Sequence, residues 1–290
     1  MNDIDYIQSL VANGGPERTQ WAHLTTWTHN LLARHQRGEI SAEQMQAIRG
    51  AFGDAFSNDT MQGFAYNKPH GYAGDYEIID RIYQYYLAPS PHTKWDEYWQ
   101  AHPAANAVRN RKSYFHELLT RTAKRKPAVE VLKIASGPGR SMYEWLCAHD
   151  YDIKFDCIEL DKNAIEFAST LNRPFMHKIS FFNMNALRFK PERKYDLIWA
   201  AGIFDYFDDA KFVSLLSRLL MARKADGEVV IGNFSTRNPS ESYMRIFDWN
   251  LFHRDVDQLR TLALAAGAPP AAIHIGQEPE GVNLFLHILG

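Results

Sequence analysis

The sequence is poor in cysteine. Its 290 residues include only Cys147 and Cys157, which fall in a predicted helix and a predicted strand. The twelve histidines are scattered, with no His-Glu-x-x-His pattern and no clustered carboxylates to complete a metal site. So little cysteine indicates a reduced, cytoplasmic protein, and we expect no bound metal.

Long apolar runs and blocks of one charge are also missing. No stretch approaches the roughly 18 uninterrupted apolar residues of a membrane span. The opening residues, MNDIDYIQSL, lack the basic and apolar segments of a signal peptide. The net charge is −2, and the basic run at 121–126 is short enough to be the solvated end of a helix. We therefore expect a globular protein without a nucleic-acid partner.

Residues 1–125 have a helical pattern. Side chains from Trp21 to His35 recur at three- and four-residue spacing, and Ser41 with Gln44 has the sequence of a capping box. No segment before residue 128 has the pattern of a strand. We predict an all-α N-terminal domain over residues 1–125.

Residues 126–290 alternate between strand and helix patterns. This alternation predicts an α/β domain with a Rossmann-like, doubly wound and mostly parallel seven-stranded sheet, whose C-terminal hairpin adds an antiparallel strand. The predicted strands cover 128–135, 154–160, 178–186, 194–202, 227–234 and two segments of 271–289, and the helices cover 140–150, 162–171, 209–223 and 254–267.

The first strand breaks into a glycine turn, Ala135-Ser136-Gly137-Pro138-Gly139, before a helix. Such a turn holds an anionic or zwitterionic ligand against the helix N-terminus. A phosphate loop would need Gly-Lys-Ser/Thr, which is absent here. A dinucleotide site would need a third glycine where Met142 stands, which weakens that alternative without excluding it.

A third candidate ligand is S-adenosylmethionine, whose ribose needs an acidic partner. Glu159 ends the second strand, 20 residues beyond Gly139, and Asp161 follows it. Asn185 follows the next strand, and the segment DLIWAAGIFDYF ends the fourth.

With these four motifs in order, residues 128–290 resemble the class I S-adenosylmethionine-dependent methyltransferases. The resemblance implies that residues 135–139 line the methionyl group, that Glu159 binds the ribose and that Asn185 binds the adenine. Two positions depart from the family pattern: Lys133 replaces an acid, and Ala135 replaces the first glycine. The cofactor-binding residues expected on this basis are Ala135, Ser136, Gly137, Pro138, Gly139, Glu159, Leu160, Asp161, Asn185, Ala186, Ala201 and Tyr72.

A narrower resemblance rests on HGYAGDYEIID, AGIFDYF and GNFSTRNPSESYMRIFDWNLFHR. These segments are similar to a bacterial subgroup with an N-terminal helical lid. The subgroup includes enzymes that make methyl esters of 3-hydroxy fatty acids and enzymes that cyclise S-adenosylmethionine to azetidine-2-carboxylate. The resemblance implies that residues 1–125 form a lid and substrate domain.

We expect four residues to carry the chemistry: Asp205, Tyr206, Asn233 and Tyr76. Asp205 lies just past the fourth strand, where open parallel sheets bind ligands, and Asp208 and Asp209 are better placed than Asp205 to cap the next helix. Asn233 ends the fifth strand and would bind a substrate polar group or cap a turn.

Aromatic faces stabilise a sulfonium cation, which gives the aromatic residues near the predicted site a second possible role. Tyr72 and Tyr76 lie in a loop between glycines that we expect to close over the ligand, whereas Phe204 is expected in the core. For Arg254 we favour a salt bridge to the acidic residues Asp248, Asp255 and Asp257 over a substrate contact.

The sequence thus predicts methyl transfer from S-adenosylmethionine to a small-molecule carboxylate, hydroxyl or amine, in secondary or signal metabolism. In the main alternative, the α-amine of S-adenosylmethionine attacks its own γ-carbon and releases methylthioadenosine. A non-catalytic ligand sensor and a nicotinamide oxidoreductase are the remaining alternatives.

Overall fold

The computed structural model describes residues 2–290, which form two compact units. A helical unit runs up to Asn106 and includes Pro239–Asn250; an α/β unit comprises Ala107–Asn238 and Leu251–Gly290. This division differs from the predicted boundary at residue 125 in two places. Most of the helix before the first strand belongs to the α/β unit, and a short segment after the fifth strand belongs to the helical unit.

The helical unit contains no strand in the part of the chain that the structure describes, as the sequence predicted. The capping box of Ser41 and Gln44 is confirmed at the start of the third helix. The helices of this unit are α1 (Asp3–Ala12), α2 (Trp21–Gln36), α3 (Ala42–Gly50), α4 (Met61–Asn67), α5 (Tyr76–Tyr83), α6 (Thr93–Ala101) and α11 (Glu241–Ile246), with 3₁₀ turns η1 (Arg18–Gln20) and η2 (Gly53–Phe56).

A buried carboxylate braces the helical unit. Asp96 on α6 accepts hydrogen bonds from the backbone N–H of Met61, at the start of α4, and from that of Ala88, each at 2.8 Å. Burial raises the pKa of Asp96 to about 6 despite these two donors. One side chain therefore satisfies two backbone groups that would otherwise be buried without a partner.

The α/β unit has the predicted seven-stranded sheet. Its strand order is β3-β2-β1-β4-β5-β7-β6, parallel from β3 to β5, with β7 antiparallel to both β5 and β6. Only β7 runs against the other strands, as predicted, because β6 is antiparallel to β7 and therefore has the same direction as β5. The strands are β1 (Val129–Ile134), β2 (Ile153–Glu159), β3 (Ile179–Asn183), β4 (Tyr195–Ala201), β5 (Arg223–Phe234), β6 (Ile273–Gln277) and β7 (Asn283–Leu289).

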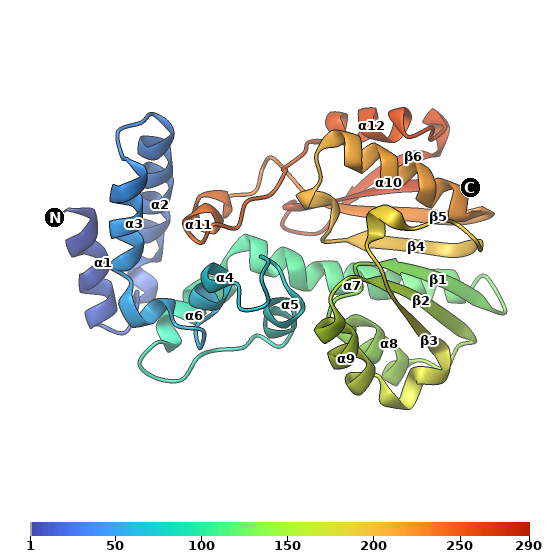
Figure 1. The fold of residues 1–290 in the computed structure, drawn as a ribbon, viewed down its shortest axis with the longest axis horizontal. Helices are drawn as coiled ribbons and strands as arrows, with labels where there is room; N and C mark the ends of the chain where they lie inside the picture. Colours follow the sequence, from blue (N-terminus) through green and yellow to red (C-terminus); the bar gives the residue numbers. More distant parts are fainter. Residues whose placement is uncertain (1) are drawn as a thin grey trace. The chain divides into compact units, whose positions relative to one another are not determined.

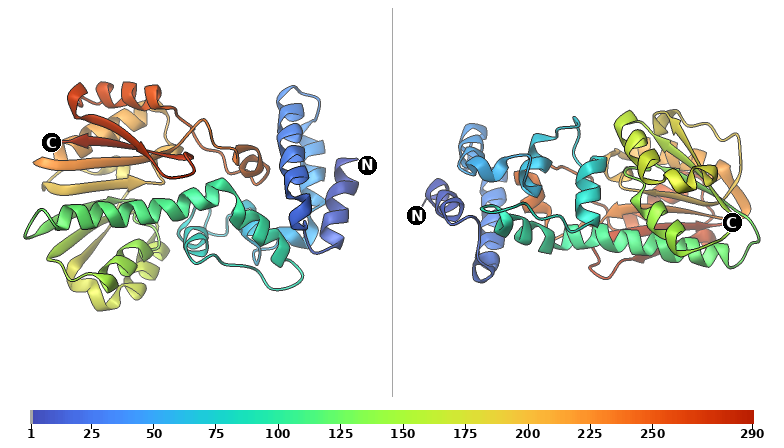
Figure 2. Two further views of the ribbon diagram at one scale, coloured as in Figure 1. Left: turned by 180° about the vertical axis from the view of Figure 1, so that it is seen from behind. Right: turned by 90° about the horizontal axis from the view of Figure 1, so that it is seen from below.

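Helices cover both faces of the sheet, as a doubly wound fold requires (Figure 1). Aromatic and aliphatic side chains of α7 and α8 pack on one face, and those of α10 and α12 pack on the other. Figure 2 shows α7 running along the sheet. The helices are α7 (Pro103–Ala123), α8 (Arg140–Ala148), α9 (Lys162–Leu171), α10 (Asp209–Ala222) and α12 (Val256–Ala265), with 3₁₀ turns η3 (Arg173–Lys178), η4 (Ala186–Arg188), η5 (Phe204–Tyr206) and η6 (Pro270–Ala272).

Packing explains where the unit boundary falls. Phe115, Leu118 and Leu119 of α7 are buried against the sheet, so this helix folds with the strands rather than with the helices before it. Between residues 2 and 290, no helix combines the length and apolar character that crossing a membrane demands.

The brace at Asp96 gives a stability prediction. We expect Asp96→Ala to lower the free energy of unfolding by about 2–4 kcal/mol, because two buried backbone donors lose their acceptor. Urea titration of the full chain measures the change. The matched control is Asp54→Ala, at an exposed position of η2, which should change the free energy by less than about 0.5 kcal/mol. Equal effects of the two substitutions would show that Asp96 is no brace.

Candidate functional site

The glycine turn after β1 uses the left-handed backbone region three times. Ala135, Gly137 and Gly139 have φ angles of 50°, 59° and 71°. Glycine adopts this region without strain, whereas an L side chain pays roughly 1–2 kcal/mol there. Ala135, which stands where the family pattern has its first glycine, thus takes the backbone conformation of a glycine.

The two glycines of the turn serve different purposes. A Cβ atom at Gly139 would lie 2.8 Å from Asn172 Nδ2 and 2.9 Å from Ala168 Cβ, so this glycine allows the turn to pack against α9. A Cβ atom at Gly137 would meet nothing within 4 Å. The backbone of Gly137 therefore borders open space at the carboxyl edge of the sheet.

Glu159, the last residue of β2, holds this turn in place. Its Oε2 accepts a hydrogen bond from the N–H of Gly137 at 2.9 Å. Its Oε1 accepts from the N–H groups of Leu160 and Asp161 at 2.8 Å and 3.1 Å. The carboxylate thereby joins the first two strand ends, and the sequence-predicted turn and acid come together.

An apolar surface lies beside Glu159. Leu160 is 63% exposed and Met184 is 37% exposed. The backbone N–H of Met184 donates to the Glu159 carbonyl at 3.0 Å, so the two apolar side chains flank the same strand end. A flat aromatic base would find apolar contacts there.

Asn185 and Asp161 have capping roles that the sequence analysis did not predict. Asn185 Oδ1 accepts from the N–H of Leu187 at 2.8 Å at the start of η4, and Ala186 next to it is buried. Asp161 accepts from the N–H of Asn163 at 2.8 Å and caps α9. Both residues border the same edge of the sheet as Glu159.

These features fit S-adenosylmethionine. The Ser136 hydroxyl oxygen is buried yet has no hydrogen-bond partner among residues 2–290, as expected of a group that a ligand satisfies. The open space at Gly137 suits the zwitterionic methionyl end of this ligand, and the carboxylate of Glu159 suits its ribose. The apolar surface at Leu160 suits its adenine base.

Asp205, in η5 just after β4, is a buried carboxylate at this edge. Its Oδ1 accepts from the N–H of Phe234 at 2.5 Å, and its carbonyl accepts from the N–H of Phe252 at 2.7 Å. Oδ2 accepts no hydrogen bond from a described residue. Burial raises the pKa of Asp205 to about 6, although the positive charges of Arg111 and Arg254 oppose the rise. Such a carboxylate can accept a proton near neutral pH.

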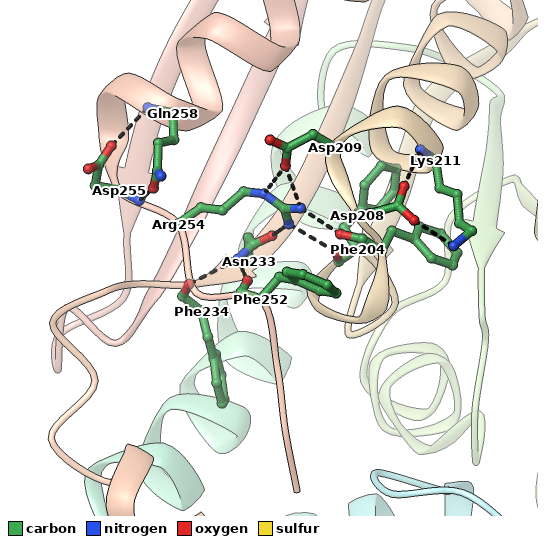
Figure 3. A network of polar contacts seen from close by, with 11 residues as sticks. Phe204, Asp208, Asp209, Lys211, Asn233, Phe234, Phe252, Arg254, Asp255 and Gln258 are labelled. Atoms are coloured by element: carbon green, nitrogen blue, oxygen red, sulfur yellow. Dashed lines mark hydrogen bonds and ion pairs between the residues drawn. The ribbon is translucent and has the colours of Figure 1, made fainter. Parts of the chain in front are cut away.

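Arg254 holds the backbone of the segment that follows β4 and contacts Asp209 and Asn233 (Figure 3). Its guanidinium donates to the carbonyls of Phe204 and Phe207, at 3.2 Å and 2.5 Å, and forms an ion pair with Asp209 at 2.9 Å. The predicted partners were wrong, because Asp255 caps α12 and Asp248 pairs with Lys68 in the helical unit. Phe204 is in the core and Asp208 caps α10, as predicted.

Asn233, at the end of β5, belongs to the same network. Its Oδ1 accepts from Arg254 Nη1, and its Nδ2 donates to the carbonyls of Phe234 and Phe252, all at 2.9 Å. Each of these bonds holds the protein's own chain, so the amide positions the loop that donates to Asp205.

The predicted aromatic residues are distributed over both units. Tyr206 in η5 is partly exposed, and Ala201, the last residue of β4, is half-buried. Tyr72 and Tyr76 belong to the helical unit, where Tyr76 begins α5 and contacts the His70 ring. Their predicted contact with the ligand stays a prediction. Throughout residues 2–290, no three His, Cys, Asp or Glu side chains gather as ligands to a metal would.

Two buried cations lie near the turn: Lys133, which the sequence analysis named only as a departure from the family pattern, and Arg111, which it did not consider. Lys133 on β1 donates to the Ser136 carbonyl and to the Ser141 hydroxyl, both at 3.0 Å, and burial lowers its pKa to about 8. Arg111 lies on α7, one turn before Phe115. A charged residue inside the apolar stripe of a helix was the signal that would have identified Arg111.

Comparison with solved structures establishes the fold. A possible exported protein from Bordetella parapertussis has a TM-score of 0.64 at 18% identity, over 74% of this chain and 79% of that one. Magnesium protoporphyrin IX methyltransferase from Synechocystis PCC 6803 has a TM-score of 0.51 at 9% identity, over 79% and 96% of the two chains. The pyocyanin biosynthetic protein PhzM has a TM-score of 0.50 at 13% identity, over 85% of this chain and 72% of that one.

A search of curated protein sequences gives no match. A family model, described as AdoMet-dependent proline di-methyltransferase, matches residues 102–262. This agrees with the resemblance to class I methyltransferases, and the cosubstrate of the family is S-adenosylmethionine. Since the match spans more than half of the sequence, the chain belongs to this family of S-adenosylmethionine-dependent methyltransferases.

Proposed function

We propose that the protein transfers the methyl group of S-adenosylmethionine to a small molecule, and that the acceptor atom is an amine nitrogen. The observation that carries this proposal is Asp205, a buried carboxylate with one oxygen free at the edge of the sheet that bears the glycine turn. The family description supports a nitrogen acceptor, because two methyl groups on proline fit its amine.

The residues around the turn would hold the cosubstrate. Residues 135–139 line the methionyl group, Glu159 accepts from the ribose hydroxyls, and Asn185 contacts the adenine between Leu160 and Ala186. When bound, S-adenosylmethionine supplies an electrophilic methyl carbon and a neutral thioether leaving group. The protein then has to align the acceptor and exclude water, as a buried site does.

Asp205 would prepare the acceptor. An amine attacks only when neutral, so its ammonium form must first lose a proton. The free Oδ2 of Asp205 accepts that proton, and burial gives this carboxylate a higher proton affinity than an exposed one has. Asn233 acts as a positioning residue through the Phe234 loop, and Tyr206 contributes an aromatic face to the sulfonium.

A cytoplasmic location and a role in secondary or signal metabolism are parts of the proposal.

Cyclisation is the second candidate, and one observation favours it. Lys133 stands where the family pattern has an acid, and a cation there disfavours the ammonium form of the methionyl amine. The neutral amine would attack the γ-carbon, the γ-carbon–sulfur bond would break with methylthioadenosine leaving, and the proton lost by the amine would pass to Asp205.

Product analysis distinguishes these two reactions. We expect purified protein to leave S-adenosylmethionine intact when no acceptor is present, and to form S-adenosylhomocysteine when proline, a prolyl peptide or another small amine is added. Mass spectrometry of all products is the measurement. Methylthioadenosine together with a cyclic C4 amino acid, formed without any acceptor, would contradict methyl transfer and establish the cyclase. Turnover with carboxylates or hydroxy acids alone would overturn the amine assignment.

Binding of the cosubstrate tests the glycine turn. We expect Gly137→Ala to weaken S-adenosylhomocysteine binding about tenfold or more in calorimetry while costing only about 1–2 kcal/mol of stability, since its Cβ enters open space. Gly139→Ala should cost more stability, because its Cβ would lie 2.8 Å from Asn172 Nδ2. Unchanged affinity in folded Gly137→Ala protein would contradict the assigned site.

Glu159 tests the ribose contact. Glu159→Gln keeps the size but replaces one acceptor oxygen with a donor, and we expect affinity for S-adenosylhomocysteine to fall roughly tenfold. Glu166→Gln, at an exposed position of α9, is the control and should bind normally.

The proton affinity of Asp205 predicts a pH profile. Since the ionised carboxylate is the base, kcat/KM should fall as the pH drops through about 6. Asp205→Asn should lower kcat/KM by about 10²–10⁴-fold and abolish this acidic limb. Asp208→Asn, at the cap of α10, should retain both the rate and the limb. An acidic limb that persists in Asp205→Asn would assign the base to another residue.

A further inference from the structure

Two cations are buried on one face of the sheet, beside the turn. Lys133 and Arg111 are each only 6% exposed. Lys133 lies on β1 among apolar neighbours, with its Nζ 5.5 Å from the ring centroid of Phe115. Arg111 precedes Phe115 by one turn of α7, and both helix residues therefore face the sheet. Burying two positive charges is costly unless negative charge accompanies them.

Arg111 reaches the carboxyl end of β4. A Cβ atom on Gly202, directly after that strand, would lie 3.1 Å from Arg111 Nη1 and 3.4 Å from both Cζ and Nη2. The guanidinium therefore lies against the backbone of Gly202, and a glycine at this position makes room for it. Gly202 has a φ of 107°, which further restricts the position to glycine.

Among residues 2–290, no carboxylate forms an ion pair with either cation. Arg111 forms no ion pair and no hydrogen bond with any residue in the described part of the chain. Lys133 Nζ donates to two uncharged oxygens, those of Ser136 and Ser141. The positive charge of Arg111 lowers the pKa of both Asp205 and Lys133, although Arg111 forms an ion pair with neither.

The two nearby carboxylates form no ion pair with either cation in the described part of the chain. Glu159 accepts three backbone N–H bonds with its two oxygens, and Asp205 accepts the N–H of Phe234 with Oδ1. The guanidinium fork and the ammonium thus remain available to one bound anion, and a guanidinium suits a carboxylate because it donates two parallel hydrogen bonds.

From this geometry we infer, on the basis of the proposed function, that Arg111 and Lys133 form a carboxylate-binding site, with Gly202 admitting the guanidinium. The carboxylate is that of the methionyl group or that of an acceptor such as an amino acid. In either case the site selects a ligand that carries a carboxylate. Lys133, one of its two cations, stands where the family pattern has an acid.

Calorimetry with two ligands tests this inference. S-adenosylhomocysteine carries the carboxylate, and its decarboxylated analogue keeps the sulfur, the chain and the amine. We expect wild-type protein to prefer S-adenosylhomocysteine, and Arg111→Gln to reduce that preference roughly tenfold to a hundredfold. Should Arg111→Gln not fold, Lys133→Met, which keeps the length of the stem, should reduce the same preference.

A second arm identifies an acceptor carboxylate. If wild-type protein and Arg111→Gln show the same preference between the two ligands, acetate is added at constant ionic strength to protein saturated with S-adenosylhomocysteine. Acetate that raises the Tm of wild-type protein, and not that of Arg111→Gln, would assign the site to the acceptor. If folded variants show neither the change in ligand preference nor the loss of the acetate effect, the inference is overturned.

The controls separate this inference from the proposed function. Lys112→Met removes one positive charge from the same helix, where Lys112 pairs with Glu144 at 2.6 Å, and should behave as wild type in both arms. Methylthioadenosine, which has no carboxylate, should bind all variants equally. Wild-type protein that bound methylthioadenosine, but showed neither a preference for S-adenosylhomocysteine nor a rise of Tm with acetate, would overturn this site alone. Failure to bind any of these ligands would contradict the proposed function as well.

Discussion

Charge buried at the carboxyl edge of the sheet is the constraint on which the rest of the site depends. Each buried carboxylate there takes backbone N–H groups as partners: Glu159 holds the turn after β1, and Asp205 holds the end of β5. Arg254 in turn holds the carbonyls on either side of Asp205. Since a buried charge without a partner is costly, these bonds fix the loops that border the ligand space.

Function follows from what this network leaves unsatisfied. Within residues 2–290, the buried Ser136 hydroxyl oxygen has no hydrogen-bond partner, and the buried residues Asp205 and Arg111 form no ion pair. In our proposals, the ligand completes each of these groups, with the zwitterionic end of S-adenosylmethionine beside Asp205 as proton acceptor. In the proposed function, the sheet is the frame and a few polar groups at its edge carry the chemistry.

Local patterns were sufficient to predict the fold. The predicted α9 agrees with the structure at both ends. The turn, Glu159 and Asp205 lie at one edge of the sheet because the parallel strands that they follow or end all have their carboxyl ends there. The domain boundary, in contrast, could not be read locally. Helix α7 has the same helical pattern as the helices before it, and only its packing on the sheet assigns it to the α/β unit.

The sequence by itself determined the order of strands and helices, the glycine turn with its acid, and membership of a methyltransferase family, because each of these is encoded in short-range pattern. The tertiary structure decided the partners. It paired Arg254 with Asp209 instead of the acids nearer in sequence, used the Asn233 amide to hold a loop, and brought Arg111 to Gly202. Such contacts join distant segments, and their energies depend on burial and distance, which no local pattern specifies.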